Sequence, residues 1–276
     1  MIFESHHIEQ PLLDYIESIF YYRGYRPEHS IERVVPTGHI FLIIELDGIE
    51  RHTYDSKTLE PNGSFKNAWV SGMQKKFLSI SAHQNSEMLV VQFKPGGAYP
   101  FLHKPIYQLN NLVVDANTLF GGSILELREQ VLETKAVIGK FKLIENWLVD
   151  KFGYDKVPDL NLVSILNQLS ANPISEGNNI VSTYPKTQKH LISQFKKYFG
   201  LTPKIFHRVF RFNEILKQIQ NKQHLLWSQI AHEFGYSDQS HFIKEFKEFS
   251  GFNPQEFLQA DYNKGEPNFF PLDRQG

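Results

Sequence analysis

The sequence predicts an α+β fold in two domains: an N-terminal β-rich, barrel-like domain that ends in helices, and an all-α domain of two helix-turn-helix units joined by a long helix. Three observations carry this prediction. Short β-branched or aromatic runs bounded by Gly, Pro, Asn or Asp fill the first half of the chain. From Leu160 onward, apolar residues recur at spacings of three and four. Finally, one phrase occurs twice, as FKKYFGLTPKIF from Phe195 and as FKEFSGFNPQEF from Phe246.

The composition excludes several classes of protein. A length of 276 residues suits two domains, and the chain contains no cysteine. Disulfides, thiolate metal sites and cysteine nucleophiles are therefore excluded. The N-terminus lacks the basic and apolar regions of a signal peptide, and the longest apolar runs are too short to span a bilayer. We therefore expect a cytoplasmic protein without a membrane segment.

The N-terminal domain is expected to cover residues 1–157. Its strands are predicted at 39–48, 67–72, 77–82 and 87–97, where each apolar run ends at turn-forming residues. Before them, PLLDYIESIFYYRG reads as a short helix that runs into a strand. After them, the spacing of apolar residues predicts helices at 123–133 and 141–153. The domain boundary is placed near GYDKVPD.

The C-terminal domain is expected to cover residues 158–262, followed by an irregular tail at 263–276. Helices are predicted from about Thr187 to Phe199 and from Pro203 to about Gln220, because proline is well suited to the first position of a helix. The second of these would join the two units as a rigid spacer. Three further helices follow, and the last of them again begins at a proline.

Each copy of the repeat contains a helix with one apolar and one polar face. At 100° per residue, Phe242, Phe246 and Phe249 share one face, and Ser240, Lys244 and Lys247 share the opposite face. Gly235 supplies the preceding turn, and Ser237 or Asp238 the cap. In the first copy Thr187 is the expected cap; Leu191, Phe195 and Tyr198 are expected to point inward, and Lys189, Ser193, Lys196 and Lys197 outward. This is the pattern of a helix-turn-helix, whose second helix lies in the DNA major groove.

The positive charge is concentrated in one window. The net charge of the chain is −1, but residues 185–222 carry nine Lys or Arg against Glu214 alone, a local +8, whereas residues 223–276 carry four basic and eight acidic groups, a local −4. Glu245 and Glu248 lie beside Lys244 and Lys247 in the sequence. We therefore expect the second unit's attraction for phosphate to be partly cancelled, and the first unit to dominate the electrostatics.

Residues 159–260 resemble the DNA-binding domain of the AraC/XylS family of bacterial transcription regulators. The resemblance is carried by IAHEFGYSDQSHFIKEFKEFSGFNPQEF (230–257) and QKHLISQFKKYFGLTPKIFHRVFRFNEIL (188–216). The first 150 residues resemble a β-rich domain attached to such regulators, typified by QFKPGGAYPFL (92–102). The resemblance implies a sequence-specific regulator that binds double-stranded DNA, with an N-terminal domain that senses a small-molecule effector or mediates dimerisation. It also implies a homodimer and a contact with RNA polymerase.

The family pattern assigns roles to individual side chains. The positions that read bases in the family correspond here to Gln188, Lys189, His190 and Ser193 in the first unit, and to Gln239, Ser240, His241 and Lys244 in the second. Phosphate contacts are expected from Lys196, Lys197, Lys204, Arg208 and Arg211. The chain departs from the pattern at SEGNNIVSTYP, where the family has a regular helix and turn before its first recognition helix.

Two alternatives stay open in the N-terminal domain. Tyr22, Phe41, Trp69 and Phe93 either line a ligand pocket or belong to an ordinary core. The domain could also be an enzyme or a metal-binding module coupled to the DNA-binding half. However, no His-x-His, Gly-x-Ser-x-Gly, P-loop or Gly-x-Gly-x-x-Gly motif occurs. We therefore expect no enzymatic activity, catalytic residues, metal or cofactor.

Overall fold

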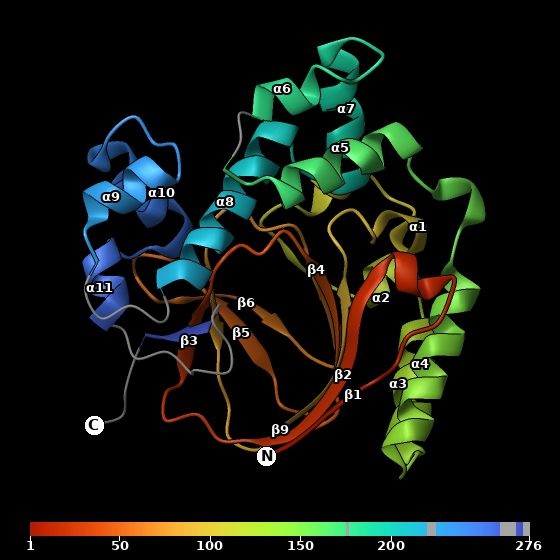
Figure 1. The fold of residues 1–276 in the computed structure, drawn as a ribbon. Helices are drawn as coiled ribbons and strands as arrows, with labels where there is room; N and C mark the ends of the chain where they lie inside the picture. Colours follow the sequence, from red (N-terminus) through yellow and green to blue (C-terminus); the bar gives the residue numbers. More distant parts are fainter. Residues whose placement is uncertain (175–176, 220–224, 260–268, 273–276) are drawn as a thin grey trace.

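The computed structural model describes residues 1–174, 177–219, 225–259 and 269–272, and contains two antiparallel sheets that face each other (Figure 1). The first sheet has the order β1-β2-β9-β4-β7-β10 and the second β11-β3-β8-β5-β6. The strand bounds are β1 Ile2–Ser5, β2 Ile16–Tyr25, β3 Ile31–Val34, β4 Ile40–Glu45, β5 Arg51–Tyr54, β6 Pro61–Phe65, β7 Ala68–Ser71, β8 Leu78–Ser81, β9 Ser86–Phe93, β10 Val113–Asp115 and β11 Phe269–Pro271. The predicted β-rich N-terminal domain is confirmed.

The other regular elements of the described chain are helices and short 3-10 turns. Their bounds are α1 Tyr99–Leu102, α2 Asn117–Phe120, α3 Ser123–Glu133, α4 Val137–Lys151, α5 Leu160–Ala171, α6 Gly177–Val181, α7 Gln188–Phe199, α8 Pro203–Ile219, α9 Trp227–Glu233, α10 Gln239–Ser250 and α11 Pro254–Gln259, with 3-10 turns η1 Leu12–Asp14, η2 Ile106–Leu109 and η3 Tyr154–Lys156. Helix α4 begins four residues before its predicted start at 141. The predicted end of α8, Gln220, lies outside the described residues.

Alternation along the strands separates two apolar cores. In β9, Leu89, Val91 and Phe93 point to the outer face of the first sheet and are completely buried beneath helices. Met88 and Val90 point the other way, into a smaller cluster between the two sheets. Because successive side chains of a strand face opposite sides, one strand serves both cores.

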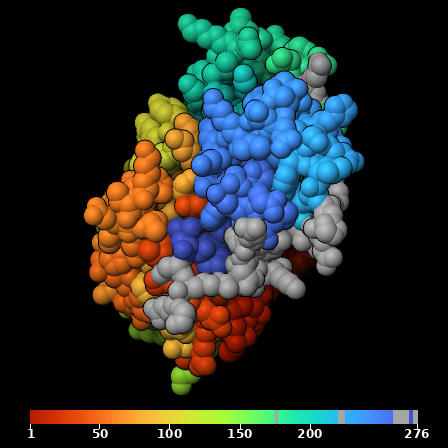
Figure 2. Space-filling model, turned by 90° about the vertical axis from the view of Figure 1, so that its left-hand side faces the viewer, coloured from red at the N-terminus to blue at the C-terminus, as the bar shows by residue number. Residues whose placement is uncertain are grey.

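The two parts of the chain share one continuous core. The larger cluster of buried side chains runs from the first sheet through α5, α7 and α8 to α10. Helices α5 and α7 approach the N-terminal domain closely at Gly96: a Cβ atom on this glycine would come within 2.8 Å of Phe199 and 2.9 Å of Leu166. Figure 2 shows the C-terminal helices, in blue, seated against the red and orange N-terminal domain. The domains are therefore packed against each other.

Part of the tail contradicts the prediction of an irregular segment at 263–276. Strand β11 pairs antiparallel with β3, so that Phe270 lies opposite Arg33. The Phe270 side chain is 0% exposed and packs on Phe257 with ring centroids 4.6 Å apart. Residues 263–268 and 273–276 lie outside the described part of the chain. The prediction failed because three residues have no periodicity of their own, and their pairing partner lies in the other domain.

We expect Phe270→Ala to lower the free energy of unfolding by about 3–5 kcal/mol, because it empties a closed apolar site. Phe3 is 55% exposed, so Phe3→Ala serves as the matched control and should cost about 0.5 kcal/mol or less. Urea titration followed by circular dichroism measures both changes. Equal losses for the two variants would show that the tail does not stabilise the fold.

Candidate nucleic-acid interface

The first recognition helix, α7, is defined by its cap and its buried face. The Thr187 hydroxyl oxygen accepts a hydrogen bond from the His190 backbone N–H at 3.2 Å, as the cap prediction required. Leu191, Phe195 and Phe199 form the buried face. Phe199 takes the place predicted for Tyr198, which is only half-buried and packs against Tyr99 of the N-terminal domain with ring centroids 4.6 Å apart.

The second recognition helix, α10, follows a tight turn. Gly235 has φ +70°, a conformation that favours glycine, and Ala231 of α9 is buried where the two helices approach. Of the two candidate caps, Asp238 is the one used: its carboxylate accepts from the His241 backbone N–H at 2.8 Å. Phe242, Phe246 and Phe249 are buried as predicted.

Both helices expose the side chains that were predicted to read bases. Gln188, Lys189 and Ser193 are exposed on α7, and Gln239, Ser240, His241 and Lys244 are exposed on α10. His190 differs, because its Nδ1 lies 2.9 Å from the Tyr184 hydroxyl and its ring stacks on that residue. A contact from His190 to DNA would therefore use its other ring nitrogen.

The predicted phosphate contacts separate into two groups. Lys196 and Lys204 are exposed, and Lys197 is half-buried with its Nζ 4.7 Å from the Tyr198 ring centroid. Arg208 and Arg211, by contrast, are paired with carboxylates of α10. Arg208 donates to Glu245 and to Glu248, both at 2.7 Å, and Arg211 donates to Glu245 at 2.8 Å. In this arrangement the two arginines tie α8 to α10.

Glu245 is the centre of this contact. Its side chain is 4% exposed, and its carboxylate also accepts from the Tyr236 hydroxyl at 2.7 Å. Burial by itself raises the pKa of the Glu245 carboxyl, but the hydrogen bonds and charges of Arg211 and Arg208 outweigh burial and hold that pKa below its usual value. Glu245 is therefore a structural anion.

This network corrects the expected charge asymmetry between the two units. Glu245 and Glu248 pair with arginines of α8, whereas Lys244 and Lys247 are exposed on α10. Removing the two paired arginines reduces the positive window from +8 to +6, and removing the two paired carboxylates reduces the negative segment from −4 to −2. The two recognition surfaces are electrostatically more alike than the sequence suggests.

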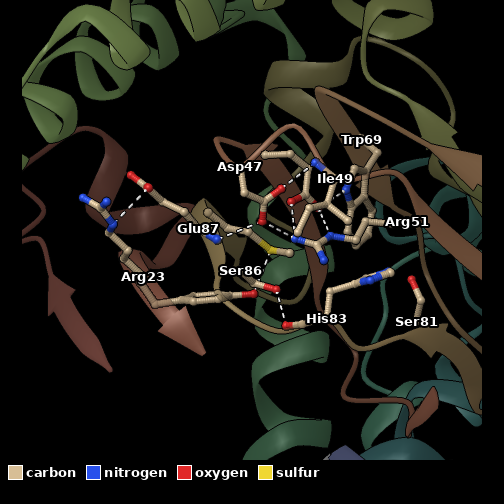
Figure 3. A network of polar contacts seen from close by, with 12 residues as sticks. Arg23, Asp47, Ile49, Arg51, Trp69, Ser81, His83, Ser86 and Glu87 are labelled. Carbon is tan, nitrogen blue, oxygen red and sulfur yellow. Dashed lines mark hydrogen bonds and ion pairs between the residues drawn. The ribbon is translucent and has the colours of Figure 1, made fainter. Parts of the chain in front are cut away.

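The N-terminal domain contains a second buried carboxylate. Arg51 donates to both oxygens of Glu45, at 3.2 and 3.0 Å, and also to Asp47. Trp69 donates from its indole nitrogen to Glu45 at 2.9 Å. Figure 3 shows Arg51 directed at Asp47, with Trp69 beside it. Burial raises the pKa of Glu45 despite its arginine partner. The sequence analysis missed this network.

The four predicted pocket residues do not converge. Tyr22, Phe41 and Trp69 belong to the cluster between the sheets, whereas Phe93 points to the outer face of its sheet and packs on Phe101. Of the two alternatives left open for Phe93, the structure shows the ordinary core, because Phe93 lies at an odd spacing from the inward-facing Met88 and Val90 of the same strand. Tyr22 and Phe41 are only half-buried although they face inward.

Within residues 1–174, 177–219, 225–259 and 269–272, no group of three or more His, Asp or Glu side chains is placed to hold a metal ion. No helix there is long and apolar enough to cross a membrane.

Comparison with known proteins finds a family model that matches a segment at each end of the chain. Residues 5–115 match a domain of unknown function (DUF6597), and residues 185–260 match a helix-turn-helix domain. No curated protein matches. The chain is similar to solved structures of ToxT from Vibrio cholerae: one at 1.65 Å resolution has 14% identity, TM-score 0.46 and coverage of 93% of this chain and 98% of that one. A second, bound to an unsaturated fatty acid, has 12% identity, TM-score 0.46 and coverage of 88% and 95%. Values this low do not establish a shared function.

We expect Glu245→Gln to lower the free energy of unfolding at pH 7 by roughly 2 kcal/mol, because it removes charge-assisted hydrogen bonds. The folded-state pKa of Glu245 is depressed, so its contribution is present above the ordinary value of 4.5 and is lost as the pH falls through the lower folded-state pKa. The difference in the free energy of unfolding between the wild type and Glu245→Gln should therefore become smaller as the pH is lowered. Urea titrations from pH 7 to pH 3 measure it.

The matched control is Glu133→Gln, which alters an exposed glutamate of α3. It should change stability little at any pH. A difference between wild type and Glu245→Gln that stays constant with pH would contradict the assignment of Glu245 as a buried anion.

Proposed function

We propose that this chain, whose residues 185–260 form a helix-turn-helix domain of the AraC type, is a sequence-specific DNA-binding transcription regulator. The observation that carries the proposal is the repeated unit, which presents two capped helices, α7 and α10, with exposed polar faces. Helices of this kind read base edges in the major groove. The proposal assigns no catalytic step to the chain.

In the proposed complex, the start and middle of each recognition helix read bases. Lys189 donates to guanine, and Gln188 and Gln239 pair with adenine, because lysine and glutamine side chains match the hydrogen-bonding edges of those bases. Ser193, Ser240 and Lys244 are exposed beside them, and His190 and His241 contribute through their outer ring nitrogens.

Phosphate contacts come from exposed lysines near these helices. Lys196 and Lys204 serve the first unit. Lys247 serves the second, because Glu245 and Glu248 beside it in the sequence are paired with arginines. Lys197 is held partly against Tyr99 and Tyr198, so it contributes less than Lys196. Arg208 and Arg211 are not proposed as phosphate contacts, because they are paired with carboxylates of α10.

The N-terminal domain is the proposed sensor of a small-molecule effector. Inward-facing aromatic side chains between its sheets remain half-buried, namely Phe20, Tyr22, Phe41 and Phe65. In a filled core such side chains would be fully enclosed, so apolar surface is available there to a small ligand. The homodimer and the contact with RNA polymerase rest on the resemblance to AraC/XylS regulators alone.

We expect Lys196→Ala to weaken binding to all duplexes about equally and to flatten the slope of log affinity against log salt by about one unit. Lys189→Ala should instead cost roughly 1–3 kcal/mol at one base pair and relax the preference there. The measurement is a salt titration on matched and mismatched duplexes, after selection of bound DNA from a random pool.

Lys142→Ala is the control, since Lys142 is exposed on α4 in the N-terminal domain. It should leave both the slope and the preference unchanged. The proposal fails if the full chain enriches no sequence from the pool at moderate salt.

A second test addresses the sensor domain. The neutral apolar dye N-phenyl-1-naphthylamine should bind the folded chain with enhanced fluorescence, and Phe41→Trp should reduce this binding several-fold by filling the space between the sheets. Tyr154→Trp adds the same side chain at a site that is 70% exposed, so it should leave dye binding unchanged. Equal binding by both variants would remove the support for a ligand site between the sheets.

A further inference from the structure

The N-terminal domain touches both helix-turn-helix units at the same point of the repeat. Gly200 lies five residues after Phe195, and Gly251 lies five residues after Phe246, so the two glycines are equivalent. Each ends its recognition helix with a positive φ, +88° at Gly200 and +75° at Gly251. Each is also covered by side chains of the N-terminal domain.

The first contact is made by the segment around η2. Asn110 donates from its side-chain amide to the Gly200 carbonyl at 2.8 Å. A Cβ atom at Gly200 would come within 2.8 Å of Ile106 and 3.2 Å of Met73. The end of α7 is therefore held directly against the N-terminal domain by a neutral hydrogen bond and close packing.

The second contact is made by β3. Arg33 donates to the Ser250 carbonyl at 3.3 Å, at the end of α10 where a cation is favoured by the helix dipole. Its guanidinium lies between two rings, 4.1 Å from the centroid of Phe77 and 4.4 Å from that of Phe252. A Cβ atom at Gly251 would come within 2.5 Å of the Arg33 Nη1.

The two contacts differ in strength. Arg33 is 8% exposed, its Nε has no hydrogen-bond partner, and no carboxylate among the residues that the structure describes pairs with it. Burial accordingly lowers the pKa of Arg33 to about 10. A buried cation without an anion is unfavourable, so the contact at α10 is the weaker of the two.

We infer that Asn110 and Arg33 are positioning residues for DNA binding, which set the directions of α7 and α10 relative to each other by holding the carbonyl groups at the two glycine caps. A shift of β3 relative to η2 within the N-terminal domain then changes the separation of the recognition helices, and the Arg33 contact releases first. This inference rests on the proposed function.

The test uses the full chain and DNA selected by it from a random pool. Binding is then measured on the selected duplex and on duplexes with one base pair inserted or deleted between the two halves of the site. We expect the wild type to bind the altered duplexes at least tenfold more weakly. Arg33→Ala should reduce this penalty to less than threefold and weaken protection of the half bound by α10. Asn110→Ala should do the same for the half bound by α7.

Two controls remove the same chemical groups elsewhere. Arg26→Ala and Asn146→Ala alter exposed residues of the N-terminal domain and should keep the wild-type penalty. Phe77→Ala removes one wall of the Arg33 site from the N-terminal side. Phe77 is only half-buried, so Phe77→Ala is expected to fold. It therefore tests the inference if Arg33→Ala does not fold, as judged by the loss of a cooperative unfolding transition.

The outcomes distinguish this inference from the proposed function. The inference is overturned if folded Arg33→Ala and Phe77→Ala lose as much affinity for the altered duplexes as the wild type does, on DNA that the wild type selects. This outcome leaves the proposed DNA-binding function intact. If the wild type selects no sequence, the proposed function fails and the inference falls with it. A penalty lost in both variants and kept in both controls supports the inference.

Discussion

The arrangement of the whole molecule depends on the burial of α8. Phe206 packs on Phe195 of the first unit, and Phe212 packs on Phe246 of the second. Between them, Val209 and Phe210 lie against the N-terminal domain at Gly38, where a Cβ atom would come within 3.3 Å of Phe210. One helix therefore supplies core side chains to three neighbours. The predicted rigid spacer is also a shared core.

Buried carboxylates fix the relative orientation of packed elements, which apolar contacts alone do not determine. Apolar side chains tolerate small rotations of one helix on another, but a carboxylate that accepts from two arginines does so in few orientations. Glu245 in the DNA-binding half is of this kind. Glu45 in the N-terminal domain is similarly constrained, because its carboxylate accepts two hydrogen bonds from Arg51 and one from Trp69. Arg33 is the exception, because it is a buried charge that pairs with no carboxylate in the described part of the chain. Under the inference above, the contact between Arg33 and the end of α10 is the one between the domains that opens most easily.

Several site features could be predicted because they are local. The Thr187 cap, the turn at Gly235 and the buried Phe242, Phe246 and Phe249 follow from residue type and helical period. Glu245 could have been found in the same way, because it lies three residues after Phe242 and so on the buried side of α10. It was assigned to the surface because of its charge rather than its position.

The sequence by itself determined the β-rich character of the first half and the helical character of the second, the repeat and the exposed faces of the recognition helices. Each of these depends on interactions among residues a few positions apart. Only the tertiary structure decided the partners of the buried charges: Glu245 pairs with Arg208 across 37 residues, and Arg33 donates to the Ser250 backbone carbonyl across 217. It also decided that β11 completes a sheet begun by β3 at the other end of the chain. Such contacts depend on how separate elements pack together, and no local pattern encodes that packing.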